Sequence, residues 1–333
     1  MEYQEEDMTT NLMYAIEALG YDEESIGISK TMEYYINMLR VTFLKKHYEN
    51  LVIVGSKCEG LEPGLHMTKE YYDNCIDWDC VYYVQGTCII MSDIGRQSNI
   101  AANDLSIIPV SQFPGYVRLQ LPPPYRSFLP NNFFYEHARI ISDSKEAKTA
   151  KITHNGPALT QFVVFGDNPM IVKKDNVICF LFKSWPQEAN KWVNRNKPNN
   201  WPSQEMITKI KTKGFTLAPI GHFDCTENEI QWRIGIRGEK ELLSNLNHTQ
   251  LMCYVALKLI LKGDIQKINE DVLSSYHAKN VIFWCVEQEP CQWTKQNFEI
   301  CLKTCINRLI KFITSKQFPH YFIEDRNLIN SKM

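Results

Sequence analysis

The pattern of hydrophobic and polar residues changes character partway along the chain. Short apolar or alternating runs, typical of strands, occur in the first part at residues 51–54, 76–84, 88–93, 161–165 and 176–182. Pro202 and Ser203 then form a helix-start signal, and helical periodicity dominates residues 240–262, 270–288 and 294–316. The pattern predicts a lobe built on a β-sheet, followed by a helical lobe.

Three other segments of the first part have patterns of their own. Residues 30–48 are amphipathic, with apolar residues at helical spacing, and they predict one long helix. The tripeptide Gln-Gly-Thr at residues 85–87 separates two strand-like runs and predicts a hairpin. The proline-rich stretch at residues 114–130 predicts a loop. The expected class is α+β, with an acidic segment (1–28), a core lobe containing the long helix (29–200) and a helical lobe (201–333).

The strand-like run 76–84 carries two aspartates, Asp77 and Asp79, at positions that share one face. Two adjacent carboxylates repel each other, and a divalent cation bound to both removes that cost. Gly55 and Ser56 follow the strand at 51–54, where backbone N–H groups and a hydroxyl suit a phosphate. This combination is the logic of a metal-dependent nucleotidyltransferase. Pattern alone leaves the third acid open among Asp143, Asp167 and Asp175, although Asp175 lies at the mouth of a strand.

Composition indicates the class of protein and the cellular compartment in which this chemistry is expected. The chain has 333 residues, 44% hydrophobic and 22% charged, with a formal net charge of -2, which is ordinary for a soluble protein of about two domains. No apolar run approaches the roughly 20 residues of a membrane span, and the acidic N-terminus resembles no leader peptide. The eleven cysteines show no framework spacing. We expect a cytoplasmic protein that does not bind membranes.

Positive charge is unevenly distributed along the chain. Residues 173–213 hold nine Lys or Arg against three acids, which indicates a surface for a phosphate-rich partner or, alternatively, an ordinary solvated face. The candidate nucleic-acid-binding residues are Arg40, Lys45, Lys46, Lys173, Lys174, Lys209, Lys211 and Lys213.

Several short motifs in the second half carry a family resemblance. They are WPQEANKW (185–192), LAPIGHF (217–223), IQWRIGI (230–236), LNHTQLMCY (246–254), LSSYHAKNVIFWCVEQEP (273–290) and FPHYFIEDRNLI (318–329). In this order they resemble the cyclic GMP-AMP synthase-like receptors, within the wider family named for the male-abnormal-21 domain. The resemblance runs from about residue 30 to the end of the sequence.

The resemblance implies a bilobed nucleotidyltransferase fold that converts ATP and GTP into a cyclic dinucleotide, using two Mg²⁺ or Mn²⁺ ions. It favours Asp175 as the third metal ligand beside Asp77 and Asp79. It also implies contacts with the nucleotides from Gly55 and Ser56 at the triphosphate, Lys258 at phosphate, Ser275 and Tyr276 at a base, and Arg233 near the acceptor base. From the residues alone, Tyr276 could instead be a core aromatic and Lys258 a solvated lysine.

The sequence also departs from the family's animal DNA sensor. That sensor has a zinc-binding insertion, whereas here only His248 and Cys253 are available, so we expect no zinc. Gly235 and Arg237 stand where that sensor has serines facing the base. Double-stranded RNA is therefore expected as the activator in preference to DNA, with a separate receptor for the product in innate immune sensing.

Two other functions are weighed beside this one. One is a non-enzymatic nucleotide- or partner-binding protein with the same fold, and the other is a synthase of linear oligoadenylates. The complete set of acids favours an enzyme over the first. The motifs at 273–290 and 318–329 favour a cyclic product over the second.

Overall fold

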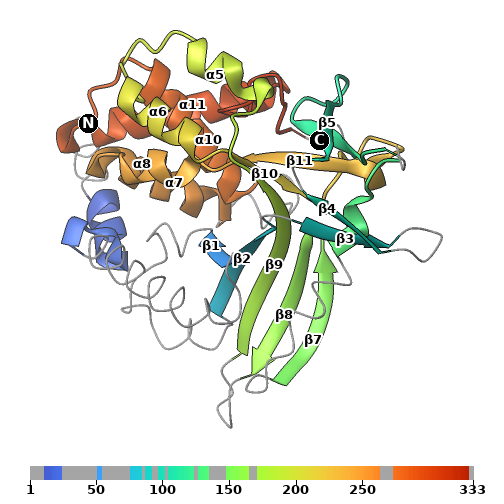
Figure 1. Ribbon diagram of the computed structural model, residues 1–333. Helices are drawn as coiled ribbons and strands as arrows, with labels where there is room; N and C mark the ends of the chain where they lie inside the picture. Colours follow the sequence, from blue (N-terminus) through green and yellow to red (C-terminus); the bar gives the residue numbers. More distant parts are fainter. Residues whose placement is uncertain are drawn as a thin grey trace.

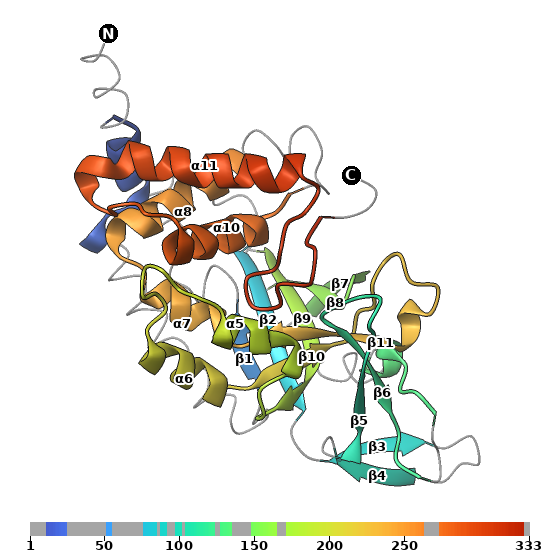
Figure 2. The same ribbon diagram turned by 90° about the horizontal axis from the view of Figure 1, so that it is seen from above.

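A large mixed sheet and a layer of helices make up the molecule, and the long strands at one end of the sheet project away from the helices (Figures 1 and 2). The computed structural model describes residues 11–24, 51–54, 76–84, 87–91, 97–101, 104–123, 127–134, 148–164, 171–262 and 273–329. The expected helix at 30–48 and the Gly55–Ser56 turn lie outside these residues, as do Arg40, Lys45 and Lys46.

The strands within the described residues form one nine-stranded sheet and one two-stranded ribbon. They are β1 (Leu51–Val54), β2 (Ile76–Val84), β3 (Thr87–Met91), β4 (Gln97–Ala101), β5 (Ser106–Pro109), β6 (Tyr116–Gln120), β7 (Lys148–Asn155), β8 (Ala158–Val164), β9 (Ile171–Phe182), β10 (Phe215–Ala218) and β11 (Gln231–Ile236). The large sheet runs in the order β1-β2-β9-β10-β11-β6-β5, and β7 and β8 join it through β9. Only the β2–β9 pair of this sheet is parallel in the described residues.

The helices lie together on one side of the sheet (Figure 1). They are α5 (Asn190–Asn194), α6 (Gln204–Thr212), α7 (Glu239–Ser244), α8 (His248–Ile260), α10 (Ser275–Gln288) and α11 (Phe298–Thr314), with short helical turns η1 (Glu17–Tyr21), η3 (Asn131–Phe134), η4 (Gln187–Ala189), η5 (Asn228–Ile230) and η7 (Lys295–Asn297). None of the described helices combines the length and apolar character that a membrane crossing requires.

Polar side chains fix where the main helices begin. Ser203 caps α6 by accepting from the backbone N–H of Met206, as the sequence predicts. Asn247 and Gln250 form a reciprocal capping box at the start of α8. Because residues 249–258 of α8 are all buried, this helix is the centre of the helical lobe, whereas α11 packs its apolar face against it and exposes the other.

The core lies between the helices and one face of the sheet. Alternate residues of the central strands are completely buried on this face, among them Val117, Leu119, Phe180, Leu217 and Trp232. Because side chains alternate along a strand, the remaining residues of β9, β10 and β11 lie on the opposite face of the sheet, outside this core.

A buried ion pair joins α5, α10 and the segment after α11. Arg195 forms two hydrogen bonds with the carboxylate of Glu287, at 2.6 and 2.9 Å, and a third with the Tyr321 carbonyl oxygen at 2.8 Å. The Tyr321 hydroxyl donates to Glu287 at 2.7 Å, and the guanidinium lies 4.0 Å from the centre of the Trp284 ring. Each polar group therefore has a partner, as burial of a charged pair demands.

The structure corrects three expectations from the sequence. β3 pairs with β4 instead of forming a hairpin with β2, whose partners are β1 and β9. Residues 116–120, expected as loop, form β6, because Val117 and Leu119 alternate with polar positions and pair with β11 and β5. Finally, residues 201–333 are not wholly helical, since β10 and β11 belong to the large sheet.

Candidate active site

Backbone pairing brings the predicted acidic positions together on neighbouring strands. β2 and β9 run parallel, with Asp79 directly paired to Asp175, and the last residue of β1, Val54, pairs with Asp79 on its other side. Neighbouring strands are about 4.8 Å apart. Position 77 is two residues before 79 and therefore belongs to the same face of the sheet.

β1 ends at Val54, which pairs with Asp79, and Gly55 and Ser56 are the next two residues in the sequence. The side chains of Asp77 and Asp79, like Gly55 and Ser56 themselves, lie outside the described residues. The main-chain pairing alone aligns Val54, Asp79 and Asp175 across three neighbouring strands.

Asp175 is the predicted acid whose side chain the structure describes. It is half-buried and accepts a hydrogen bond from the hydroxyl of Thr160 at 2.5 Å. Thr160 is buried on β8 and pairs with Asp175 in register, so its hydroxyl fixes one carboxylate oxygen. The sequence analysis missed Thr160, because only the strand register reveals it. Asp143 and Asp167, the other two candidates, lie outside the described residues.

The face that carries Asp175 continues across the sheet to Arg233. Cys179, Leu181 and Ala218 form a small apolar cluster on this face, and Ala218 pairs with Arg233. Burial raises the pKa of the Cys179 thiol to about 12, while the charge of Arg233 acts in the opposite direction. Arg233 alternates with the core residues Trp232 and Ile234 along β11, so it lies on the opposite face of the sheet, which also carries Asp175.

Tyr276 is anchored by its hydroxyl group. The hydroxyl donates to Glu239 Oε1 at 3.0 Å and lies 2.8 Å from His320 Nε2. Because His320 Nδ1 accepts from the backbone N–H groups of Phe322 and Ile323, we assign the imidazole proton to Nε2, which donates to Tyr276. Glu239 also accepts from Lys279 at 3.2 Å.

This chain of hydrogen bonds has two consequences. Burial, followed by the charge of Glu239, raises the pKa of Tyr276 well above its usual value, so the phenol stays neutral. The ring is half-buried at the start of α10, next to Ser275. A contact with a nucleobase stays a prediction for both residues. Glu239 and His320 are supporting residues that the sequence analysis did not single out, although His320 lies in the motif at 318–329.

Lys258 lies in the last turn of α8 with only 7% of its surface exposed, and its ammonium group is 5.6 Å from the centre of the Tyr254 ring. The alternative of a solvated lysine is therefore wrong. Binding of phosphate by Lys258 stays a prediction.

The basic residues do not form one continuous unpaired surface. Lys209 of α6 and Lys213, at the C-terminal cap of that helix, both pair with Glu241, at 2.5 Å, while Lys211 is exposed. Burial acts to raise the pKa of Glu241, but the two lysines outweigh it and the pKa is lowered. The side chains of Lys173 and Lys174 are not among those described, and their successive positions on β9 belong to opposite faces.

The described side chains include no group of three His, Cys, Asp or Glu residues arranged to hold a metal ion. Asp77 and Asp79 are not among those side chains, so most of the predicted metal site lies outside the described residues.

Comparison with known proteins decides the family. Residues 131–245 match the Mab-21 protein nucleotidyltransferase domain, and residues 249–333 match the Mab-21 protein HhH/H2TH-like domain. The chain belongs to the Mab-21 family. The predicted α+β, bilobed nucleotidyltransferase fold is thereby confirmed, and nucleotidyltransferases typically act with divalent metal ions.

Relatives within the Mab-21 family carry two kinds of name. Protein mab-21-like 3 of Danio rerio is 26% identical over 153 residues, covering 45% of this chain and 37% of the relative. The cyclic GMP-AMP synthase-like receptor of Trichogramma pretiosum is 26% identical over 211 residues, covering 62% and 39%. The receptor of the same name from Tribolium castaneum is 25% identical over 179 residues, covering 52% and 40%.

The match therefore spans about two fifths of the length of these curated relatives. It places the chain among the Mab-21 and cyclic GMP-AMP synthase-like nucleotidyltransferases. The two models of the Mab-21 family meet between residues 245 and 249, whereas the division at residue 201 stays a prediction.

Proposed function

We propose that this chain is a metal-dependent nucleotidyltransferase that joins ATP and GTP into a cyclic dinucleotide. The register of three strands supports this proposal most directly, because it aligns Val54, Asp79 and Asp175 across β1, β2 and β9. Carboxylates on adjacent strands are suitable ligands for Mg²⁺ or Mn²⁺, and the Thr160 hydrogen bond holds one of them in place. The residues therefore fit a two-metal site.

In this proposal Asp77, Asp79 and Asp175 hold the two ions. Such ions, when bound, activate the attacking hydroxyl and stabilise the leaving group of an in-line phosphoryl transfer. Gly55 and Ser56 bind the donor triphosphate through backbone N–H groups and a hydroxyl, and Lys258 neutralises phosphate charge.

The bases are held by a second group of residues. Tyr276 offers a flat ring of fixed orientation, since Glu239 and His320 hold its hydroxyl, and Ser275 lies next to it. Arg233 contacts the acceptor nucleotide from the same face as Asp175. An aromatic surface accepts either base, which suits a site that performs two successive transfers.

We further propose that nucleic acid activates the enzyme and that double-stranded RNA is the activator, in a cytoplasmic innate immune response with a downstream receptor for the product. Two relatives named as cyclic GMP-AMP synthase-like receptors support this direction. Exposed Lys211 is the best remaining candidate on α6 for a phosphate contact, because Lys209 and Lys213 are paired with Glu241.

A non-enzymatic binding protein is the second candidate function. It is favoured by the similarity to protein mab-21-like 3 of Danio rerio and of Xenopus laevis, whose names state no activity.

Product formation separates the two functions. Purified protein is incubated with labelled ATP and GTP and Mg²⁺ or Mn²⁺, with duplex RNA, duplex DNA or neither. Asp77→Asn is tested in parallel, with Asp104→Asn as a matched control at an exposed aspartate. We expect a phosphatase-resistant product with RNA only, which Asp77→Asn abolishes and Asp104→Asn retains. Product without nucleic acid would reject RNA activation, and no product under any condition would favour the binding protein.

A further inference from the structure

The helical lobe contains a cluster of thiols that none of the roles proposed above uses. Five of the seven cysteines whose side chains the structure describes belong to it: Cys253 on α8, Cys285 on α10, Cys291 in the following loop, and Cys301 and Cys305 on α11. The three helices pack against one another (Figures 1 and 2). Cys305 shares side-chain hydrogen bonds with Cys253 and Cys285. Cys301 shares one with Cys291.

The Cys291–Cys301 pair joins a partly exposed thiol to a buried one. Cys291 lies in the loop between α10 and α11 and is partly exposed, whereas none of the surface of Cys301 is exposed. Cys301 Sγ also donates to the carbonyl oxygen of Gln292, next to Cys291, at 3.5 Å. Burial, followed by the hydrogen bond with Cys291, raises the pKa of Cys301 well above its usual value. An oxidant from solvent therefore meets Cys291 first, while Cys301 stays a protected thiol.

The other three thiols of the cluster have no such access. Cys253, Cys285 and Cys305 are completely buried. Hydrogen bonds between these thiols, together with burial, raise the pKa of Cys285 and Cys305 well above the usual value. Buried thiols of this kind are inert and pack as small apolar groups, which leaves Cys291 as the point of entry.

The loop that carries Cys291 is held at both ends. Glu289, at its start, forms an ion pair with Arg308 of α11. Further along, the carbonyl oxygen of Trp293 accepts from the side chain of Asn247 at 3.0 Å. Because these contacts keep the two thiols beside each other, a bond between them needs little loss of chain freedom, and their effective concentration is high.

We propose that Cys291 and Cys301 are a redox modification site, at which hydrogen peroxide converts the two thiols into a reversible disulfide. The Cys291 thiolate attacks one peroxide oxygen, the O–O bond breaks, and the departing hydroxide takes up a proton to become water, so that Cys291 becomes a sulfenic acid. The Cys301 sulfur then bonds to the Cys291 sulfur, and the hydroxyl group leaves as water with the Cys301 proton. The two thiols lose two electrons, which reduce the peroxide to two molecules of water.

This inference goes beyond the proposed function, because the reaction involves neither a nucleotide nor a metal ion. In a reducing compartment, which the scattered cysteines lead us to expect, a disulfide is transient and serves as a redox sensor. A partly exposed disulfide is also open to attack by a thiol reductant, which restores both cysteines.

The first test identifies which cysteines become linked. The full chain is treated with hydrogen peroxide, free thiols are alkylated, and the protein is digested with trypsin and a glutamate-specific protease. Digestion separates Cys291 from Cys285 and leaves Cys291 in peptide 288–295 and Cys301 in peptide 300–303. We expect these two peptides to be found linked, about tenfold or more above the untreated protein, and to separate again after a thiol reductant is added.

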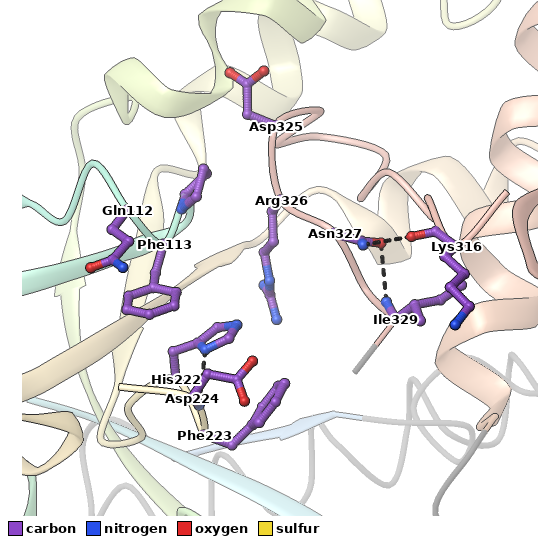
Figure 3. A pocket seen from close by; sticks show the side chains of 11 residues that line it. Gln112, Phe113, His222, Phe223, Asp224, Lys316, Asp325, Arg326, Asn327 and Ile329 are labelled. Atoms are coloured by element: carbon purple, nitrogen blue, oxygen red, sulfur yellow. Dashed lines mark hydrogen bonds between the residues drawn. The ribbon is translucent and has the colours of Figure 1, made fainter. Parts of the chain in front are cut away.

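Cys225 provides a matched control for this test. It is partly exposed like Cys291, but its Sγ accepts a hydrogen bond from Gln231 Nε2 at 2.9 Å. It follows residues 222–224, which line a pocket of about 330 Å³ (Figure 3). Cys291→Ser should abolish the linked peptides and Cys225→Ser should retain them. The inference is overturned if Cys291 stays reduced, links to another cysteine, or is oxidised beyond the sulfenic acid without a link.

A second test traps the sulfenic acid with dimedone, a carbon nucleophile that reacts with this oxidation state. Cys301→Ala removes the second thiol without placing a polar group in the core, so dimedone should label Cys291 several-fold more than in the unmodified protein. Dimedone added to the unmodified protein together with the peroxide needs no variant. It should lower the yield of linked peptides, because it competes with Cys301 for the sulfenic acid. An unchanged yield, or equal labelling of the two proteins, would contradict the proposed order of steps and the site itself.

Discussion

Two arginines, one in the helical lobe and one beside the sheet face that bears Asp175, differ in how far the fold neutralises their charge. In the helical lobe, Arg195 is surrounded by Glu287, the Tyr321 carbonyl and the Trp284 ring, so its charge is neutralised within the fold. On the sheet face that bears Asp175, burial and the charge of Arg233 act to lower the pKa of Arg326 and the charge of Glu239 acts to raise it, and Arg326 forms no ion pair with a described carboxylate. A charge that the fold neutralises serves stability, whereas a charge that it leaves unneutralised is available to a ligand.

The largest expected difference between the two arginines is in how much their substitution changes the free energy of unfolding. Arg195→Met leaves Glu287 buried and without its cation, and removing one partner of such a pair typically costs about 3–5 kcal/mol. Arg326→Met removes a charge that Arg233 repels and Glu239 attracts and that forms no ion pair with a described carboxylate, so we expect a much smaller loss in the free energy of unfolding than for Arg195→Met. Urea denaturation of both variants, with the m-value checked, measures the difference. Equal destabilisation by the two substitutions would remove the distinction between the regions.

The sequence predicts the helical lobe well because local signals and burial agree there. The cap at Ser203 and the apolar periodicity of α11 are local, and tertiary packing reinforces them. β6 was missed because the surrounding prolines indicate a loop, although Val117 and Leu119 alternate as in a strand. The wrong partner for β3 has a related cause, since a short turn suggests a hairpin but cannot exclude a parallel partner far along the chain.

For the candidate site too, the sequence predicts local features but not the contacts between residues that are far apart in the chain. The spacing of Asp77 and Asp79 is readable from the chain, but their alignment with Asp175 depends on a parallel pairing between distant segments. Thr160 and Glu239 lie in none of these motifs, and the motif at 318–329 contains His320 without revealing its role, since each of the three contacts a residue more than ten positions away. Arg326 lies within a diagnostic motif, yet its lack of a described ion pair appears only in three dimensions.

Thr160→Val tests whether a buried polar group on the sheet face serves the site more than the fold. The change keeps the side-chain shape and removes the donor to Asp175. If Asp175 holds a metal ion, loss of this supporting contact should cost about 10–100-fold in activity or metal affinity. Activity is measured across a Mg²⁺ titration, where higher metal concentration should recover part of the loss. Thr160→Ser keeps the hydroxyl and should stay close to the unmodified protein. A loss of stability as large as that of Arg195→Met would show that Thr160 serves the fold instead.

The smallest expected effect concerns the titration of His320, a buried residue whose pKa is influenced by arginines of both regions. Burial, followed by the charges of Arg326, Arg233 and Arg195, lowers its pKa well below the usual 6.5. Above the unfolded-state pKa both states are neutral and the histidine has no effect on the pH dependence. Below it the unfolded chain takes up a proton that the folded chain excludes. The free energy of unfolding therefore decreases as the pH is lowered, by at most about 1.4 kcal/mol per pH unit, until the pH reaches the folded-state pKa of His320.

We expect this contribution below the unfolded-state pKa of about 6.5, where urea denaturation of His320→Gln should show a shallower pH dependence than the unmodified protein. Glutamine can still accept from the backbone N–H groups and donate to Tyr276, so the comparison isolates the proton. Arg326→Met removes one of the charges that exclude this proton, so it should raise the folded-state pKa and end the pH-dependent loss at a higher pH. Parallel curves for His320→Gln and the unmodified protein would mean that folding does not exclude the proton.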